Sequence, residues 1–251
     1  MQLTIVLPTY NEAENLPILV PALFDLPLPD LKLLIVDDGS PDGTGQLAEQ
    51  LGEDYPGRIH VHHRSGKLGL GTAYITGFKL ALNDGAEAIG QMDSDFSHPV
   101  EKVPELMDAL EGADVAQGCR WVKGGGVDEN WPLWRRALSR WGSLYSQAIL
   151  RVPMRDVTGG FRVWRRETLE QMQLDRIRAS GYMFQIEITY MAHRLGFNIA
   201  EVPFYFPDRQ LGESKMSGLI ALEASLRVWQ ALWRYRDLKP IMPVAPSLHT
   251  P

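Results

Sequence analysis

The run Ala88-Ile89-Gly90-Gln91-Met92-Asp93-Ser94-Asp95 decides how the fold of this chain is interpreted. Its apolar part predicts a buried strand, and Phe96-Ser97-His98-Pro99 then ends the strand in a loop. Ligands of open parallel sheets bind at the carboxyl ends of the strands. Asp93 and Asp95 are therefore expected at a ligand-binding edge.

Asp93 and Asp95 are two carboxylates one residue apart, so each makes ionisation of the other more costly unless a cation lies between them. Mg²⁺ or Mn²⁺ suits an oxygen-only site and is commonly shared with substrate phosphates. Acids are also frequent in loops. Taken alone, the pair fits a metal site and a solvated loop equally well.

Short apolar runs alternate with helical patterns in the first half, which is typical of a parallel sheet with helices on both faces. Asn11 is expected to cap the first helix with Glu14 at the capping-box position, although Pro17 and Pro21 fall inside that helix. Strands are predicted over 3–7, 31–36, 58–62, 86–92 and 114–118, and helices over 12–25, 44–53, 71–83, 99–110, 132–149, 166–173, 181–195 and 217–236.

The length of 251 residues suits one α/β domain, alone or with a small extension. The formal net charge of -6 argues against a general nucleic-acid binder. Cys119 is the only cysteine, which excludes an intrachain disulfide and fits a reducing cytoplasm. We expect it to be a small buried residue and not a nucleophile.

The chain begins directly with a strand-like run and lacks the basic region of a signal peptide. No window approaches the roughly 18 apolar residues that a transmembrane helix needs. The segment 240–251 contains four prolines and is expected to be disordered.

Two helical stretches in the second half, 134–150 and 218–235, are amphipathic. A helix with Trp and Leu on one face and Arg on the other can lie in a membrane interface. Packing against the core is the more frequent explanation of such a stripe. In the second helix the apolar side carries Leu219, Ile220, Leu222, Leu226, Trp229, Leu232 and Trp233, and the arginines elsewhere are Arg227, Arg234 and Arg236.

Polar and aromatic residues also follow the first two predicted strands. Tyr10 offers a ring, Glu12 an acceptor and Asp38 an acid at the sheet edge, a set that suits a nucleoside. Ordinary turn chemistry is the alternative, and it is the better explanation of Asp42-Gly43.

The glycine-rich segment Gly66-Lys67-Leu68-Gly69-Leu70-Gly71-Thr72 precedes a predicted helix. It does not have the Walker spacing, and Tyr74 stands where a dinucleotide-binding loop has its third glycine. A P-loop NTPase and a dehydrogenase are therefore disfavoured. The backbone amides of the loop and Lys67 remain able to approach a ligand.

Several motifs, in their order and spacing, resemble glycosyltransferase family 2, and specifically its polyprenol (dolichyl) phosphate mannosyltransferases. The resemblance covers about residues 3–217, and the motifs from Gly118 onward separate this subfamily from other members. The motifs are Leu7-Pro8-Thr9-Tyr10-Asn11-Glu12, Val36-Asp37-Asp38-Gly39-Ser40-Pro41-Asp42-Gly43-Thr44, Lys67-Leu68-Gly69-Leu70-Gly71-Thr72-Ala73-Tyr74, Met92-Asp93-Ser94-Asp95, Gly118-Cys119-Arg120, Asp156-Val157-Thr158-Gly159-Gly160-Phe161-Arg162, Gly181-Tyr182-Met183-Phe184-Gln185-Ile186-Glu187 and Asp208-Arg209-Gln210-Leu211-Gly212-Glu213-Ser214-Lys215.

The resemblance implies a GT-A fold, which is a Rossmann-like, mostly parallel sheet flanked by helices. It implies transfer of mannose from GDP-mannose to polyprenyl phosphate, with inversion at the sugar carbon. Together with the residue patterns, it predicts a GT-A catalytic domain over 1–217, an amphipathic helix over 218–238 and a disordered tail over 239–251.

The resemblance also assigns roles to single residues. Guanosine is held by Pro8, Tyr10, Glu12, Val36 and Asp38. The sugar nucleotide is bound by Asp93, Ser94 and Asp95, with the two acids acting through Mg²⁺ or Mn²⁺. The diphosphate is neutralised by Arg120, Arg209 and Lys215. The acceptor phosphate is received by Arg120, Arg135 and Ser139, with Arg136 and Arg140 as further candidates.

The chemistry agrees with these roles. Metal, Arg and Lys stabilise the charge on a departing diphosphate. An acceptor phosphate is already anionic near pH 7, so no general base is needed. Glu187 and Asp156 are then expected to position loops or the sugar. His98 assists a metal or, as we prefer, ends the loop.

Many relatives carry C-terminal transmembrane helices, whereas this chain resembles the short form with only the catalytic domain. We expect it at the cytoplasmic face of a membrane, held by its amphipathic helices or by a small membrane partner subunit. UDP-glucose as donor and another family 2 reaction remain alternatives. A non-catalytic sugar-nucleotide-binding subunit is a further alternative, which the presence of Asp93, Arg209 and Lys215 disfavours.

Overall fold

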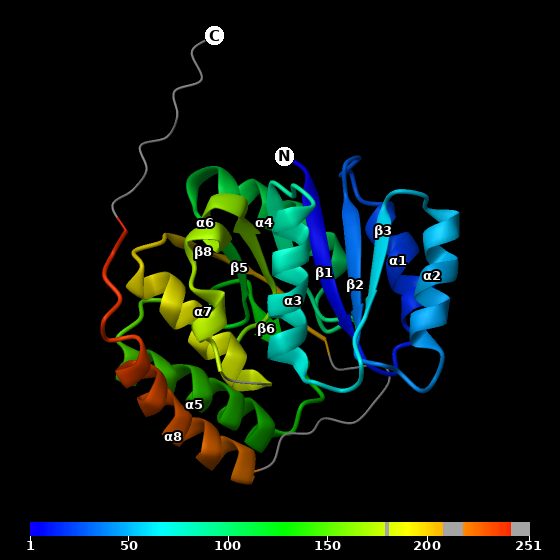
Figure 1. The fold of residues 1–251 in the computed structure, drawn as a ribbon. Coiled ribbons are helices and arrows are strands. Elements are labelled where there is room, and N and C mark those ends of the chain that lie inside the picture. Colours follow the sequence, from blue (N-terminus) through cyan, green and yellow to red (C-terminus); the bar gives the residue numbers. More distant parts are fainter. Residues whose placement is uncertain (179–180, 208–217, 242–251) are drawn as a thin grey trace.

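The computed structural model describes residues 1–178, 181–207 and 218–241. Its centre is a seven-stranded sheet in the order β3-β2-β1-β4-β7-β5-β8 (Figure 1). Only β7 is antiparallel to its neighbours. The strands are β1 Leu3–Thr9, β2 Lys32–Asp37, β3 Ile59–His63, β4 Ala88–Gln91, β5 Val115–Cys119, β7 Arg162–Arg165 and β8 Ile199–Pro203, and a separate parallel ribbon pairs β6 Gly126–Val127 with β9 Tyr205–Phe206.

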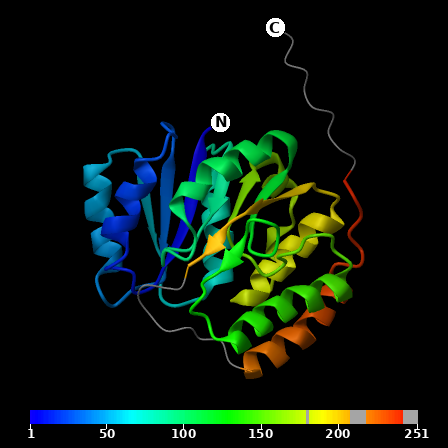
Figure 2. The ribbon, with the colours of Figure 1, turned by 180° about the vertical axis from the view of Figure 1, so that it is seen from behind.

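Helices cover both faces of the sheet. One apolar core lies between the sheet and helices α3 and α7. The other lies between the opposite face of the sheet and helices α1 and α4, and Figure 2 shows the molecule from that side. The helices are α1 Leu16–Phe24, α2 Thr44–Asp54, α3 Leu70–Asn83, α4 Val103–Ala109, α5 Leu133–Leu150, α6 Arg166–Gln171, α7 Tyr182–Arg194 and α8 Gly218–Arg234, with 3-10 turns η1 Val100–Lys102, η2 Leu110–Gly112 and η3 Leu174–Arg176.

Strand β1 shows why the sheet forms here. All seven of its residues are buried, as expected for a parallel strand covered on both faces. Successive side chains point to opposite faces, so Ile5 enters one core and Val6 the other. On the Val6 side α3 packs so closely that a Cβ on Gly77 would lie 2.3 Å from Val6 Cγ1. The expected α/β class is confirmed.

The five predicted strands and eight predicted helices all form, with shifted ends. The prediction over 99–110 is wrong in one respect, because the segment is a 3-10 turn, a short α-helix and a second 3-10 turn. Pro104, in the first turn of α4, has no amide hydrogen to continue a longer helix from the preceding turn. Strands β6 to β9 were not predicted.

The predicted Asn11 cap is wrong. Helix α1 begins at Leu16, and Asn11 has a positive φ of 62° four residues before its N-cap, Asn15. Pro17 lies in the first turn, where a missing amide hydrogen costs little. Pro21 is accommodated inside the helix.

Helices α5 and α8 lie side by side below the sheet (Figures 1 and 2). Tyr145 Oη on α5 donates to the Ser225 carbonyl at 3.3 Å, and Trp229 Nε1 on α8 donates to Tyr145 Oη at 2.9 Å. None of the helices described is long and apolar enough to cross a membrane. The tail predicted to be disordered lies outside the described residues from 242 onward.

The core-packing explanation is wrong for three residues of the α8 apolar stripe. Leu226, Trp229 and Trp233 are 63%, 46% and 64% exposed. Helix α5 also turns several apolar side chains away from the core, and the residues that it buries include Ser139, Ser143 and Ser146. Its exposed apolar side chains are Leu133, Trp134, Trp141 and Leu144, and together with the three from α8 they form what we call the Trp-rich face.

Candidate active site

The acid pair lies at the carboxyl edge of the sheet, as predicted. Asp93 and Asp95 follow β4 directly and are both half-buried. The register places Val6 of β1 opposite Gln91, so the two strands end close together. Ser94 Oγ donates to the Pro8 carbonyl at 3.1 Å, which ties the loop after β4 to the end of β1.

Asp93 is held from two sides. Tyr74 Oη, on α3, donates to Asp93 Oδ1 at 2.6 Å, and the Asp93 backbone N–H donates to His98 Nδ1 at 2.9 Å. The Tyr74 ring is fully buried and stacks on Phe184 with centroids 5.7 Å apart. Burial and the neighbouring Asp93 charge raise the pKa of Tyr74, so its hydroxyl stays a donor.

His98 lies in the loop between β4 and η1 and is buried there, and its preferred role of ending the loop stays a prediction. Its ring is 2% exposed and stacks on Phe161 at 4.9 Å. Burial lowers the pKa of His98 and favours the neutral ring. Because Nδ1 accepts the Asp93 N–H, the single ring proton belongs on Nε2. His98 thus positions the Asp93 backbone.

The acid pair fits a divalent metal. Asp95 Oδ1 accepts the Ser97 N–H at 3.1 Å, which orients this carboxylate within the loop. The described part of the chain contains no cluster of three or more His, Cys, Asp or Glu that could hold a metal. Two carboxylates that leave the remaining positions to water and phosphate are the donor set that Mg²⁺ commonly accepts.

Asp38 anchors the glycine-rich loop. Its carboxylate accepts Arg64 Nη1 at 2.5 Å and the backbone N–H groups of Leu68 and Gly69, both at 3.1 Å. Arg64 also donates to Thr72 Oγ1 at 2.6 Å. The pattern of residues gave no sign of Arg64, because an arginine after a strand is usually a surface charge. The guanosine contact of Asp38 stays a prediction.

The other predicted nucleoside residues lie near the same edge. Lys67 Nζ lies 3.7 Å from the centroid of the Tyr10 ring, so a cation and a flat ring stand together there. Glu12 Oε2 accepts Asn15 Nδ2 at 2.5 Å. Val36 pairs with Pro8 on one side and His62 on the other and is fully buried, so its predicted guanosine contact stays a prediction.

The Asp42-Gly43 turn is confirmed as turn chemistry. Asp42 Oδ1 accepts the Thr44 N–H at 3.1 Å and the Thr44 hydroxyl at 2.5 Å, and Oδ2 accepts the Ala13 N–H. Gly43 has a φ of 88°, in the region that favours glycine. The turn therefore joins the loops after β1 and β2.

Arg120 is oriented by Asp156. Its Nε and Nη2 each lie 2.7 Å from an oxygen of that carboxylate, and its Nη2 also donates to Thr158 Oγ1 at 3.0 Å. Arg120 is 8% exposed and Asp156 is fully buried. Burial opposes the charged form of Asp156, but the charge and hydrogen bonds of Arg120 hold its pKa below the usual value. The expected positioning role of Asp156 is thus visible in its contacts.

Of the predicted acceptor residues, Arg135 and Ser139 lie on α5, whereas Arg120 directly follows β5. Ser139 is 7% exposed, and the Arg135 guanidinium lies 3.8 Å from the centroid of Trp131. Arg209 and Lys215, predicted to neutralise the diphosphate, lie outside the described residues. Their roles stay predictions.

A buried polar layer beneath the acids was missed. Arg162 on β7 is 1% exposed and donates to the side chains of Gln117, Gln185 and Thr189. Burial lowers the pKa of Arg162 to about 9. Gln91 Nε2 also donates to Gln185 Oε1, at 2.5 Å. The sequence did not indicate that Arg162 is buried, because it is a charged residue in a short strand that was not predicted.

Glu187 links α7 to α8, in line with the expected positioning role. Its carboxylate accepts Arg234 Nη1 at 2.5 Å, Tyr235 Oη at 3.2 Å and the Arg178 N–H at 3.1 Å. These contacts fix the C-terminal end of α8 against the body of the fold.

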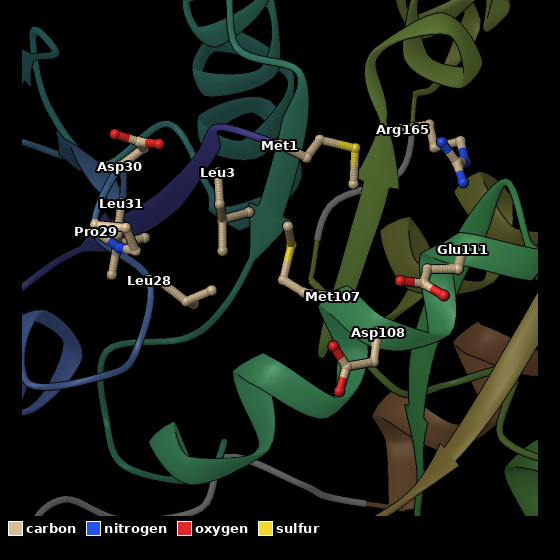
Figure 3. A pocket seen from close by; sticks show the side chains of 10 residues that line it. All are labelled: Met1, Leu3, Leu28, Pro29, Asp30, Leu31, Met107, Asp108, Glu111 and Arg165. Atoms are coloured by element: carbon tan, nitrogen blue, oxygen red, sulfur yellow. The ribbon is translucent and has the colours of Figure 1, made fainter. Parts of the chain in front are cut away.

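A hollow of about 490 Å³ lies at the opposite, amino-terminal edge of the sheet (Figure 3). Its lining includes apolar side chains such as Leu3 and Met107, and three acids, Asp30, Asp108 and Glu111. Arg165 in the lining donates to the carbonyls of Ala113 and Leu110. An acidic lining disfavours a nucleotide diphosphate, so this hollow is separate from the site.

Comparisons with known proteins agree with the geometry. A family model described as Glycosyl transferase family 2 matches residues 4–173. The chain is 46% identical over 233 residues to a polyprenol monophosphomannose synthase of Mycolicibacterium smegmatis, covering 92% of this chain and 86% of that protein. It is 43% identical over 241 residues to an undecaprenyl-phosphate mannosyltransferase of Micrococcus luteus, covering 95% and 98%.

Solved structures with the same fold include a glucosyl-3-phosphoglycerate synthase of Mycobacterium tuberculosis in complex with Mn²⁺, UDP and glucosyl-3-phosphoglycerate. The TM-score is 0.64, the sequence identity is 21%, and the match covers 96% of this chain and 81% of that one. At this identity the likeness supports the fold alone.

Proposed function

The chain belongs to glycosyltransferase family 2, and from that premise we propose that it transfers mannose from GDP-mannose to the phosphate of a polyprenyl phosphate, with inversion at the sugar carbon. The observation that carries this proposal is the match to two relatives whose names give a polyprenol-linked phosphate and mannose. Each match covers more than nine tenths of this chain.

The donor side of the reaction rests on the acid pair. Asp93 and Asp95 would hold Mg²⁺ or Mn²⁺, which supplies positive charge to the departing diphosphate when it is bound. Arg209 and Lys215 are proposed to add further positive charge there. Tyr10, Glu12 and Asp38, with the backbone at Pro8 and Val36, are proposed to hold the guanosine.

The acceptor supplies its own nucleophile. A phosphate monoester carries about 1.5 to 2 negative charges at pH 7, so its oxygen attacks the sugar carbon without a general base. His98 is not placed to act as such a base, because its Nδ1 accepts the Asp93 N–H and its Nε2 carries the ring proton. Arg120, Arg135 and Ser139 are proposed to hold the acceptor phosphate.

The Trp-rich face is proposed to lie on the cytoplasmic surface of a membrane. Exposed Trp and Leu side chains beside arginines on α5 and α8 are typical of helices that lie in a membrane interface. Trp141 stacks on Tyr145 and Trp229 donates to Tyr145, so the aromatic side chains of the two helices adjoin one another. A small membrane partner subunit could cover part of this face.

The direct test is transfer of labelled mannose from GDP-mannose to a short-chain polyprenyl phosphate with Mg²⁺ or Mn²⁺ present. A thermal-shift panel of GDP-mannose against UDP-sugars tests the donor separately, because a ligand that binds only the folded protein raises its melting temperature. Stabilisation by UDP-glucose and not by GDP-mannose would overturn the donor assignment. Binding without turnover would indicate a non-catalytic subunit.

A further inference from the structure

Two arginines flank the ring of Trp121, which follows Arg120 directly in the chain. Arg120 Cζ lies 5.7 Å and Arg140 Cζ lies 5.3 Å from the centroid of this ring. Arg140 comes from α5, one residue after Ser139. The ring thus lies between the end of β5 and the helix that carries Arg135 and Ser139.

The two arginines differ in how their charge is balanced. Arg120 is paired with the buried carboxylate of Asp156. Arg140 is half-buried, and among the described residues no carboxylate forms an ion pair with it. The planar guanidinium of arginine matches carboxylate and phosphate oxygens, so an arginine without a carboxylate partner is suited to bind an anion.

Unpaired hydrogen-bond donors meet at the same ring. Trp121 Nε1 and Arg140 Nη1 are buried, and neither has an acceptor in the described structure. Most buried polar groups in proteins have a partner, so each exception calls for an explanation. Indole and guanidinium nitrogens only donate, and the missing partner must therefore carry acceptor oxygens.

The position of this pair indicates which anion it receives. Helix α5 presents Ser139 inward and the neighbouring Trp141 outward, on the Trp-rich face. An anion at Arg140 therefore lies between the proposed lipid surface and the sheet edge. The donor diphosphate, in contrast, is proposed to lie at the acid pair after β4. An anion that enters from the lipid side is the phosphate of the acceptor.

We propose that Arg140 and the indole N–H of Trp121 bind non-bridging oxygens of a phosphate monoester on an amphiphilic acceptor, beside Arg135 and Ser139. This proposal rests on the function proposed above. The monoester carries about 1.5 to 2 negative charges. After transfer of the sugar the phosphate is a diester, which carries one negative charge and has one non-bridging oxygen fewer to accept hydrogen bonds than the monoester. The pair therefore favours the substrate over the product and assists product release.

The test uses Trp121→Phe, which keeps the ring and removes only the N–H, and Arg140→Gln. Initial rates are measured with a short-chain, water-soluble prenyl phosphate, so that membrane binding does not enter. We expect the KM for the prenyl phosphate to rise about tenfold or more in Arg140→Gln and a few-fold in Trp121→Phe. The KM for GDP-mannose should stay within about twofold in both.

Arg151→Gln, an exposed arginine at the end of the same helix, is the matched control and should leave both KM values unchanged. Melting temperatures show whether each variant folds. If Arg140→Gln does not fold, the same KM values are measured for Trp121→Phe and Arg140→Lys instead. Unchanged KM values for the prenyl phosphate in folded variants of an active enzyme would overturn the proposal.

Calorimetric binding of the same prenyl phosphate separates this proposal from the function on which it rests. If the wild-type protein transfers no sugar, the proposed function fails. The subsite is then still supported by prenyl phosphate binding that Arg140→Gln weakens about tenfold or more, with the corresponding prenol not bound. Equal binding by wild type and Arg140→Gln would contradict the subsite directly.

Discussion

The proposed donor and acceptor sides of the candidate active site differ at Trp121 and Arg140, where buried donor nitrogens lack an acceptor in the described part of the chain, although the neighbouring Arg120 is paired with Asp156. On the donor side, Asp38 accepts three hydrogen bonds and Asp93 is held by Tyr74 and His98. On the acceptor side, Trp121 and Arg140 present buried nitrogens with no acceptor in the described residues. We infer from this difference that the proposed donor side is formed before binding, whereas the part of the proposed acceptor side at Trp121 and Arg140 is completed by its ligand.

Removing a carboxylate of the proposed donor side should have the largest effect on activity. We expect Asp95→Ala to lower turnover by about 100-fold to 1,000-fold, because the charge on the departing diphosphate is no longer offset. Mannose transfer at saturating Mn²⁺ measures this, and calorimetry with Mn²⁺ alone should show weaker binding. Asp108→Ala, in the acidic hollow at the opposite edge, should change neither value.

Asp156→Asn tests the buried ion pair that orients Arg120. Leaving a buried arginine without its counter-ion should lower the free energy of unfolding by about 3 to 5 kcal/mol. Urea unfolding measures this. Asp175→Asn, at an exposed ion pair with Lys79, should cost no more than about 1 kcal/mol. Equal losses in the two variants would contradict the role given to Asp156.

The same carboxylate predicts a pH dependence. The pKa of Asp156 is lower in the folded protein than in the unfolded chain, where it is about 3.9. The stabilisation by Asp156 is therefore fully present when the pH is above the pKa of this carboxyl in the unfolded chain. It is lost as the pH falls through the lower pKa of the folded protein. Unfolding measured from pH 6 downward should lose stability below about pH 4 in the wild type, and less steeply in Asp156→Asn.

Tyr74→Phe removes the hydroxyl that holds Asp93 and keeps the stacked ring. We expect the apparent affinity for Mn²⁺ and the turnover to fall about tenfold, since a partner that orients a metal ligand commonly contributes 10-fold to 100-fold. Tyr235→Phe, which removes a buried hydroxyl near Glu187, is the control and should leave Mn²⁺ binding unchanged. An unaltered Mn²⁺ affinity in Tyr74→Phe would show that Asp93 does not depend on Tyr74.

The smallest expected effect concerns the Trp-rich face. Replacing both Leu226 and Trp233 with serine should weaken binding to phospholipid vesicles several-fold, because exposed apolar area is lost, without changing the KM for GDP-mannose. Ile18→Ser, at an equally exposed apolar residue on α1, is the control. Co-sedimentation measures the binding, and an equal loss in the control would show that the face is not specific.

Secondary structure was predicted best where an element has a clear local sequence pattern and also packs as that pattern suggests. Leu3 to Thr9 and Thr44 to Asp54 were predicted closely because a buried parallel strand and a helix after a turn each have a clear local pattern. The acid pair was placed correctly because it follows such a strand. Strand β7 was missed because Arg162 and Arg165 flank only two apolar residues, and its burial depends on Gln117 and Gln185 from distant segments.

The residues that hold the site were harder to predict for the same reason. Tyr74 reaches Asp93 from a helix that precedes it by 19 positions, and Arg64 reaches Asp38 across 26 positions. The pairing of Arg140 with Trp121 depends on where α5 lies after the β6 segment. Such contacts between elements follow from packing and leave no periodic signal in the chain.

The most direct test of the central claim is transfer of labelled mannose from GDP-mannose to a water-soluble prenyl phosphate by the wild-type protein, with Mn²⁺ and with excess chelator. We predict a mannosyl prenyl phosphate product with Mn²⁺, and a loss of about 100-fold or more with chelator and, separately, in Asp95→Ala. Full activity under either condition, or transfer from UDP-glucose and not from GDP-mannose, would contradict the account.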